Sequence, residues 1–161
     1  MRLLYLFFPL LFSACTTTSQ WKLNNLSGAG AQFHSVKLKH KSSDLIRGLE
    51  LEFLRLHDKI FAYINVYSQT VPSSTTPDCA SVTLHMGGEV YEDVAKKLEG
   101  GQRLLLKEDM AEKIITALSK GQSVTIILNG YEEVITPESF IPNFQKLADK
   151  LPLGKKLANR E

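Results

Sequence analysis

The chain has 161 residues, with 19 lysine and arginine residues against 17 aspartate and glutamate residues and a formal net charge of +2 at pH 7. This length suits one domain with a core of its own. A charge so close to zero argues against a general nucleic-acid binder, because such proteins gain most of their affinity from a basic surface that neutralises phosphates. We therefore expect one globular domain and no nucleic-acid partner.

The first residues are typical of a signal peptide. Arg2 precedes an apolar run from Leu3 to Phe12, which is shorter than the roughly 20 residues of a membrane-spanning helix. The sequence that follows, Phe12-Ser13-Ala14-Cys15, resembles a bacterial lipobox, although that motif usually has leucine where Phe12 stands. The resemblance implies that residues 1–14 are removed and that the Cys15 thiol is joined to a diacylglycerol. A signal peptide cut elsewhere and a buried core element are the alternatives.

Lipidation at Cys15 would make the protein a membrane-anchored lipoprotein. Each buried methylene contributes about 0.8 kcal/mol, so two or three fatty chains on one residue hold a protein effectively permanently. Thr16 follows the cysteine in place of aspartate, and in Gram-negative lipoproteins this resemblance implies the outer membrane. Residues 15–32 are then expected to form the lipidated N-terminus and a flexible tether, with a reach of about 20 to 25 Å. Within the tether, Trp21 is expected either at the lipid interface or docked on the domain.

The next part of the chain has the period of two that is typical of strands. Apolar residues alternate with charged ones over 36–41 and 49–53, and residues 60–67 are apolar on both sides. A change of phase at 54–56 indicates a bulge before a turn at 57–59. Residues 68–78, rich in serine, threonine and proline, predict a mobile surface loop.

Two hairpins and two helices are predicted beyond this loop. Gly87-Gly88 indicates a hairpin over 82–97, although residues 90–98 also fit an amphipathic helix, and Asn129-Gly130 indicates a second hairpin over 124–135. A short strand is expected at 103–106. Helices are expected at about 108–120 and at about 142–150, where Phe144, Leu147 and Leu151 would be buried.

These elements predict an α+β fold. We expect a mostly antiparallel sheet of about seven short strands, with both helices packed on one face, in a single domain over residues 33–151. Residues 152–161 are expected to form a basic tail.

The alternating lysines Lys37, Lys39 and Lys41 form one charged row on the first predicted strand. Such a row can contact an acidic partner, and it can also protect an edge strand from pairing with other chains. The aromatic residues Phe61, Tyr63 and Tyr67 share one face of a later strand. They are expected to be core residues covered by a helix, with a ligand groove as the alternative.

Residues for catalysis or metal binding are not evident in the sequence. The four histidines, His34, His40, His57 and His85, lie on different predicted elements, so neither a metal site nor a cofactor is expected. The acidic pairs Glu50/Glu52 and Glu132/Glu133 are interpreted as solvated strand residues. Lipidation of Cys15 leaves Cys79 as a single thiol, which would need an activating partner for catalysis.

The sequence therefore favours a non-catalytic binding or envelope-assembly module, anchored to the membrane and in contact with another envelope protein. A lipid-anchored hydrolase would require an acid, a base and a nucleophile in one pocket. A carrier of small apolar ligands would require a sizeable apolar cavity between the sheet and the helices.

Overall fold

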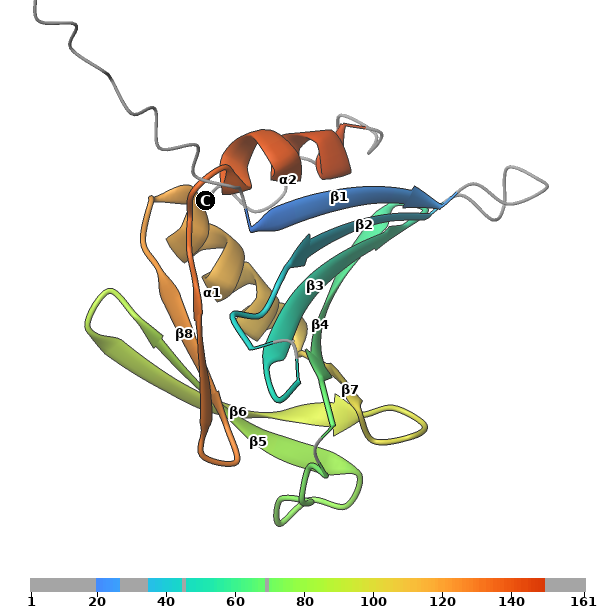
Figure 1. Cartoon of the computed structure of the whole chain (residues 1–161), viewed down its shortest axis with the longest axis vertical. Coiled ribbons are helices and arrows are strands. Elements are labelled where there is room, and N and C mark those ends of the chain that lie inside the picture. Colours follow the sequence, from blue (N-terminus) through green and yellow to red (C-terminus); the bar gives the residue numbers. More distant parts are fainter. Residues whose placement is uncertain (1–19, 27–34, 45, 69, 150–161) are drawn as a thin grey trace, which may run out of the picture.

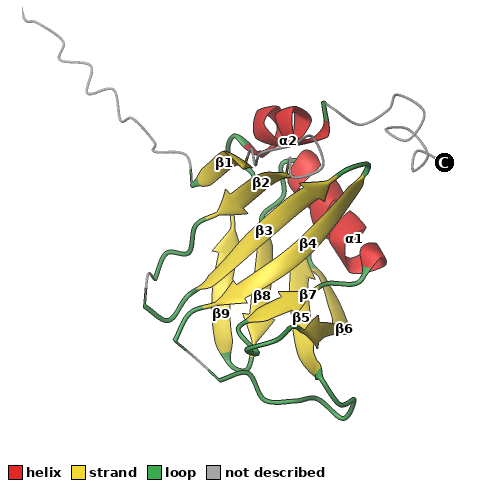
Figure 2. Cartoon of the chain, turned by 90° about the vertical axis from the view of Figure 1, so that its right-hand side faces the viewer, coloured by secondary structure: helices red, strands yellow, loops and turns green. Residues whose placement is uncertain are grey.

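A computed structural model describes residues 20–26, 35–44, 46–68 and 70–149. These residues form one nine-stranded sheet and two helices (Figures 1 and 2). The strands are β1 (Trp21–Leu26), β2 (Ser35–His40), β3 (Leu49–Leu56), β4 (Lys59–Val66), β5 (Cys79–Met86), β6 (Glu89–Lys97), β7 (Arg103–Leu105), β8 (Val124–Leu128) and β9 (Tyr131–Ile135). The helices are α1 (Glu108–Ser119) and α2 (Phe140–Ala148).

The strands lie in the order β1-β2-β3-β4-β7-β6-β5-β8-β9, and every pair of neighbours is antiparallel. The predicted antiparallel sheet with two helices is therefore confirmed in outline, but the fold contains more strand than expected. Most connections are hairpins, which explains why local sequence signals locate most strands.

Strand β1 lies inside the segment that was expected to be a tether. Its register with β2 runs from Trp21↔His40 to Leu26↔Ser35. Trp21 is buried and Lys22 is exposed, which is the alternation of a strand with one face on the core. The prediction of a spacer over this segment was wrong because β1 gains its apolar contacts from distant parts of the chain. It follows that β2 is an inner strand.

The predicted bulge at residues 54–56 was also wrong. The β3–β4 register is continuous from Leu49↔Val66 to Leu56↔Lys59. The apparent change of phase arises because Arg55 points into the core side, where it is buried, while Leu56 on the other face is exposed. At these two positions the polar side chain faces the core and the apolar one faces solvent, while the backbone pairing of the strand is regular.

Two tight turns have the backbone conformation that their residues predict. Gly87 and Gly88 have φ values of 57° and 86°, and Asn129 and Gly130 have values of 50° and 78°. Two successive residues with positive φ are the signature of the turn that matches the twist of antiparallel strands. The hairpin over β5 and β6 is therefore confirmed, and the helical alternative for residues 90–98 is wrong.

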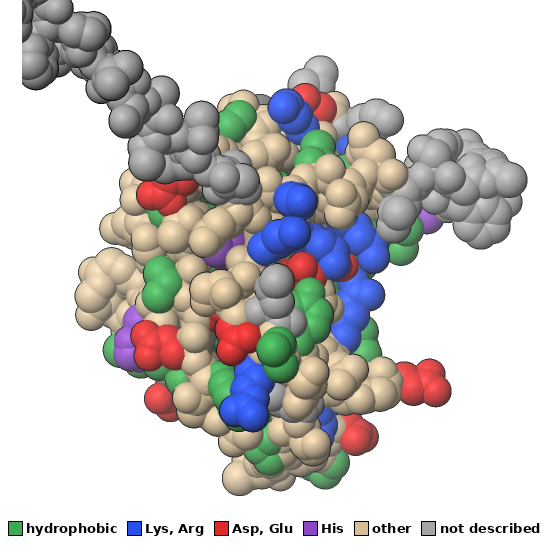
Figure 3. All heavy atoms as spheres, viewed as in Figure 1, with side chains coloured by type: hydrophobic (Ala, Val, Ile, Leu, Met, Phe, Trp, Pro, Cys, Tyr) green, Lys and Arg blue, Asp and Glu red, His purple; other side chains and the backbone are tan. Residues whose placement is uncertain are grey.

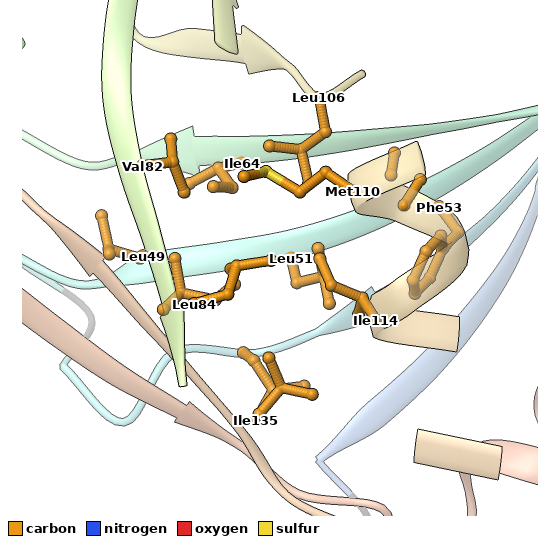
Figure 4. Close-up of a cluster of buried hydrophobic side chains, with 14 of the residues drawn as sticks. Leu49, Leu51, Phe53, Ile64, Val82, Leu84, Leu106, Met110, Ile114 and Ile135 are labelled. Carbon is orange, nitrogen blue, oxygen red and sulfur yellow. The ribbon is translucent and has the colours of Figure 1, made fainter. Parts of the chain in front are cut away.

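The core fills the space between the curved sheet and α1 (Figure 4). Met110, Ile114 and Leu118 project from α1 and pack among sheet residues such as Leu51 and Leu84, which are fully buried. The prediction of this helix is confirmed, because the apolar stripe at helical spacing is what the core requires. Val71 joins the same core from the loop after β4.

Helix α2 covers β1 and β2. It begins at Phe140, two residues earlier than predicted, because Pro142 fits in the first turn, where its missing N–H has no partner in the helix. Leu147 is buried as predicted and Phe144 packs against the core. Leu151 and the predicted tail lie outside the described residues.

Within the part of the chain that the structure describes, no helix is long and apolar enough to cross a membrane.

Candidate functional site

Five neighbouring cations lie on one part of the sheet face that is turned away from the core. We call this surface the basic outer face, and its members are Lys22, Lys37, Lys39, Lys41 and Arg103. They come from β1, β2 and β7 and from the residue that follows β2. Figure 3 shows lysine and arginine side chains gathered over this side of the molecule, with acidic groups between them.

Two carboxylates of β3 lie beneath the cations. Glu50 and Glu52 are only 6% and 2% exposed. Lys39 Nζ lies 2.8 Å from Glu50 Oε1 and 3.1 Å from Glu52 Oε2. Glu52 Oε1 is also 3.7 Å from Lys37 Nζ and 2.6 Å from Arg103 Nη2. The prediction that this pair is solvated was wrong, because β3 is an inner strand and long basic side chains from both sides cover its carboxylates.

Neighbouring polar and aromatic groups complete this network. Asn65 Nδ2 donates a hydrogen bond to Glu50 Oε1 over 2.9 Å, and the Arg103 guanidinium lies 3.9 Å from the centre of the Tyr63 ring. Burial lowers the pKa of Lys39, but its hydrogen bonds to Glu50 and Glu52 outweigh that effect and raise the pKa. The centre of the basic outer face is therefore internally neutralised to a large extent.

Lys22 and Lys41 differ from the other cations. Both side chains are exposed, and neither forms an ion pair with a carboxylate of the described residues. The proximity of Lys41, by hydrogen bonding and by repulsion of like charges, lowers the pKa of Lys22. Within the basic outer face, the uncompensated charge thus lies at the start of β1 and the end of β2.

The sequence predicted Lys37, Lys39 and Lys41 as partner contacts, and the structure places them on one face but in different environments. Lys37 and Lys39 are half-buried over the carboxylates, and Lys41 is exposed just past β2. The interpretation of these lysines as edge protection was wrong, because β1 pairs with β2 along its whole length. The sequence did not reveal Lys22 as a member of this face because β1 was not recognised. It did not reveal Arg103 because local sequence does not show that β7 lies beside β4. Cys15 lies outside the described residues.

The aromatic row of β4 belongs to the same outer face. Phe61, Tyr63 and Tyr67 are half-buried and lie on the side of β4 that is opposite to its buried residues. The expectation that a helix covers them was wrong, since α1 packs on the core side. These rings add apolar area next to the charged network.

A second polar cluster lies where β9 ends beside β1 and β2. Ser42 Oγ donates a hydrogen bond of 2.5 Å to Glu133 Oε2, and the Ser43 N–H donates one of 2.9 Å to Glu133 Oε1. The backbone N–H of Thr136 donates to His40 Nε2 over 3.2 Å. Glu133 and His40 are buried, so the expectation that both members of the Glu132/Glu133 pair are solvated was wrong.

This cluster contains a serine, a histidine and a carboxylate, but they are connected differently from a nucleophilic triad. In a triad the serine hydroxyl is hydrogen-bonded to the imidazole. Here the hydroxyl is bound to the carboxylate, and His40 Nε2 accepts a backbone N–H. Burial lowers the pKa of His40 to about 4, although Glu133 and Glu138 oppose the shift. The arrangement is suited to joining distant strands.

A groove with a volume of about 440 Å³ lies between α1 and the β5–β6 hairpin. Most of its lining is polar, including Glu89, Asp109 and Glu112, and Lys113 Nζ lies 4.5 Å from the centre of the Tyr91 ring. Such a lining differs from the predominantly apolar walls of sites for small apolar ligands.

The other residues considered for catalysis, Cys79 and His85, lie far apart in the structure. Cys79 and His85 both lie on β5, and six residues along a strand span about 20 Å, so spacing in sequence did not bring them together. Among residues 20–26, 35–44, 46–68 and 70–149, no group of three or more histidine, cysteine, aspartate or glutamate side chains is arranged to hold a metal ion.

Comparisons with protein-family models, with curated proteins and with solved structures found no match to this chain.

Proposed function

We propose that this chain is a bacterial lipoprotein, anchored through fatty chains on Cys15, whose β-rich domain is a non-catalytic binding or assembly module of the cell envelope. In a Gram-negative host, Thr16 after the lipidated cysteine directs it to the outer membrane. The basic outer face is the contact surface for an acidic envelope partner. The anchor part of this proposal depends on the lipobox-like sequence.

The observation that supports the binding role is the composition of the basic outer face. Three of its cations cover two buried carboxylates, an amide and an aromatic ring lie beside them, and the other two cations are exposed on the same open sheet surface. Complementary charge of this kind favours specific orientation and fast association with an acidic surface. Aromatic and arginine side chains are also enriched at protein interfaces.

Metabolic labelling with palmitate tests the anchor. The native chain is expected to take up label and to fractionate with membranes. Cys15→Ser should abolish both, because only the thiol can carry the thioether-linked lipid. Cys79→Ser is the matched control and should keep the label. Persistent labelling of the Cys15→Ser protein would contradict the assignment.

Crosslinking in intact cells tests the contact surface. A photoreactive amino acid at Asn24, which is exposed on the outward side of β1, should capture a discrete partner. Charge reversal at Lys37, the register partner of Asn24 on β2, should weaken this capture. The same amino acid at Glu92, which is exposed on β6, is the control position. Equal capture from both positions would argue against the basic outer face as the contact surface.

A further inference from the structure

We infer that Lys22 and Lys41 hold the domain against the anionic lipid headgroups of the membrane in which Cys15 is anchored. This inference rests on the proposed lipidation of Cys15 and adds an orientation to it. The basic outer face then has two ends with different roles. The Lys22 and Lys41 end faces the bilayer, while Lys37 and Arg103 remain further from it.

The chain between the anchor and the fold is short. Gln20, directly before β1, is already bound to the domain, because its carbonyl oxygen accepts a hydrogen bond from the N–H of Lys41 over 3.1 Å. Gln20 is five residues after Cys15. Five residues span at most about 18 Å when fully extended, and a flexible chain of this length has a root-mean-square reach of about 12 Å. The domain is thus held much closer to the lipid than the tether predicted from the sequence would hold it.

The uncompensated charge of the basic outer face lies close to this short connection. Lys41 is hydrogen-bonded through its backbone to Gln20, and Lys22 is the second residue after Gln20. Both are therefore next to Gln20, the described residue that is nearest to Cys15 in the sequence. The other cations of the face are occupied by Glu50 and Glu52, so they contribute less to any external contact.

The charge of the two lysines is complementary to that of anionic headgroups. Lys22 and Lys41 are close enough for each to repel the other's positive charge, and an anion placed beside them relieves that repulsion. The screening length at physiological ionic strength is about 8 Å, which is comparable to the reach of the short connection. A lysine near an anionic membrane favours the bound orientation about fivefold, so the pair favours it about 30-fold.

A membrane surface fits this position better than a separate acidic polymer. The short connection keeps the two lysines close to the headgroups of the anchoring membrane at all times, so their encounter with lipid is intramolecular and benefits from a high effective concentration. An acidic polymer must reach the same narrow region from solution.

Lysine acylation on reconstituted vesicles tests the inference with the lipidated protein. The protein is placed in vesicles of phosphatidylcholine alone and of phosphatidylcholine with phosphatidylglycerol, and recovered by flotation. Each sample is treated briefly with an amine-acylating reagent, and the rate at each lysine is obtained by peptide mass spectrometry. Lys59 and Lys120, both exposed and remote from Gln20 in the chain, are the internal controls.

The expected result is a rate at Lys22 and Lys41 at least about tenfold lower on the anionic vesicles than on the neutral ones. Lys59 and Lys120 should react equally on both, and high salt should remove the difference. Lys41→Gln should reduce the protection of Lys22 about fivefold, while Lys120→Gln should leave it unchanged.

Equal rates at Lys22 and Lys41 on both kinds of vesicle, with the protein floating on both, would overturn the inference and leave the anchor intact. Protection on neutral vesicles by an added acidic polysaccharide, without any by phosphatidylglycerol, would also overturn it and favour a polymer partner. A protein that floats with neither kind of vesicle would refute the anchor itself, and the inference with it.

Discussion

The indole Nε1–H of Trp21 donates a hydrogen bond of 2.8 Å to the carbonyl oxygen of Thr136, which lies 115 residues away in the sequence. The backbone N–H of the same Thr136 donates to His40 Nε2. Side chains from β1 and β2 thus bind both peptide groups of the residue that follows β9. In Figure 1 the orange β8–β9 hairpin has its loop at the bottom, and its open end, where β9 finishes, approaches the start of the blue β1. These contacts close the curved sheet over the core.

Removal of the indole should weaken this closure. Trp21 is 4% exposed and packs against the rings of His40, Phe53 and Phe140. Trp21→Ala should lower the free energy of unfolding by about 3 to 5 kcal/mol. Trp21→Phe keeps a ring but leaves the Thr136 carbonyl without its donor, so it should cost about 1 to 3 kcal/mol. Urea titration followed by circular dichroism measures both, and an unchanged midpoint for Trp21→Phe would contradict the role of this hydrogen bond.

Stability should depend on pH through His40. Its pKa is lowered to about 4 in the fold, whereas an unfolded histidine titrates near 6.5. Between these values the unfolded chain binds the proton and the folded chain does not, so stability is full above about pH 6.5 and falls as the pH decreases toward 4. The contribution lost between pH 6.5 and pH 5 is about 2 kcal/mol.

Denaturant titrations over this pH range measure that effect. His40→Gln should be less stable at pH 7 but should show a weaker decline toward pH 5. His85→Gln changes an exposed histidine on β5 and serves as the control. A His40→Gln protein with the same pH dependence as the parent would show that the decline has another origin.

The contrast between β1 and the hairpins shows what the sequence could and could not predict. Turn chemistry is local, so Gly87-Gly88 and Asn129-Gly130 located their hairpins correctly. The stripe of α1 was equally clear. Strand β1 has only six residues, half of them polar, and its pairing with β2 and the packing of Trp21 stabilise it as a strand. Those interactions are distant in sequence, so no local pattern contains them.

The candidate site was harder to predict for the same reason. The row of Lys37 and Lys39 was visible, but its meaning depended on whether β2 lies at an edge. The burial of Glu52 depends in part on Arg103, which reaches it from β7, 51 residues further along the chain. Alternating charge along a strand indicates which side chains share a face, but it does not identify the cations that arrive from other strands.

Neutralisation of Glu52 should destabilise the outer face. This carboxylate is 2% exposed and lies within 4 Å of three cations, Lys37, Lys39 and Arg103. Glu52→Gln leaves those cations crowded together without their shared counter-charge. Because the cations are partly solvated, we expect a loss of about 1 to 3 kcal/mol in the free energy of unfolding. Glu92→Gln, an exposed position on β6, should change it by less than about 0.5 kcal/mol. Equal effects of the two substitutions would contradict the network.

Arg55 should control the stability of α2. Its Nη1 donates a hydrogen bond of 2.8 Å to the carbonyl oxygen of Leu147, near the end of the helix. Arg55 is buried, and a cation at a helix C-terminus also interacts favourably with the helix dipole. Arg55→Met should cost about 1 to 3 kcal/mol.

Amide hydrogen exchange distinguishes this effect from general destabilisation. Exchange of α2 amides should accelerate more in Arg55→Met than exchange of α1 amides. Lys96→Met, which changes an exposed cation on β6, should accelerate neither. Uniform acceleration throughout the domain would show that Arg55 stabilises the core in general and does not act on α2.

The intact mass of the native protein extracted from membranes tests the account most directly. The account predicts a chain that begins at Cys15 and carries the additional mass of a diacylglycerol and an acyl group, with both modifications on the N-terminal peptide. A chain that still begins at Met1, with an unmodified thiol at Cys15, would contradict the anchor, the proposed function and the orientation of the domain at the membrane.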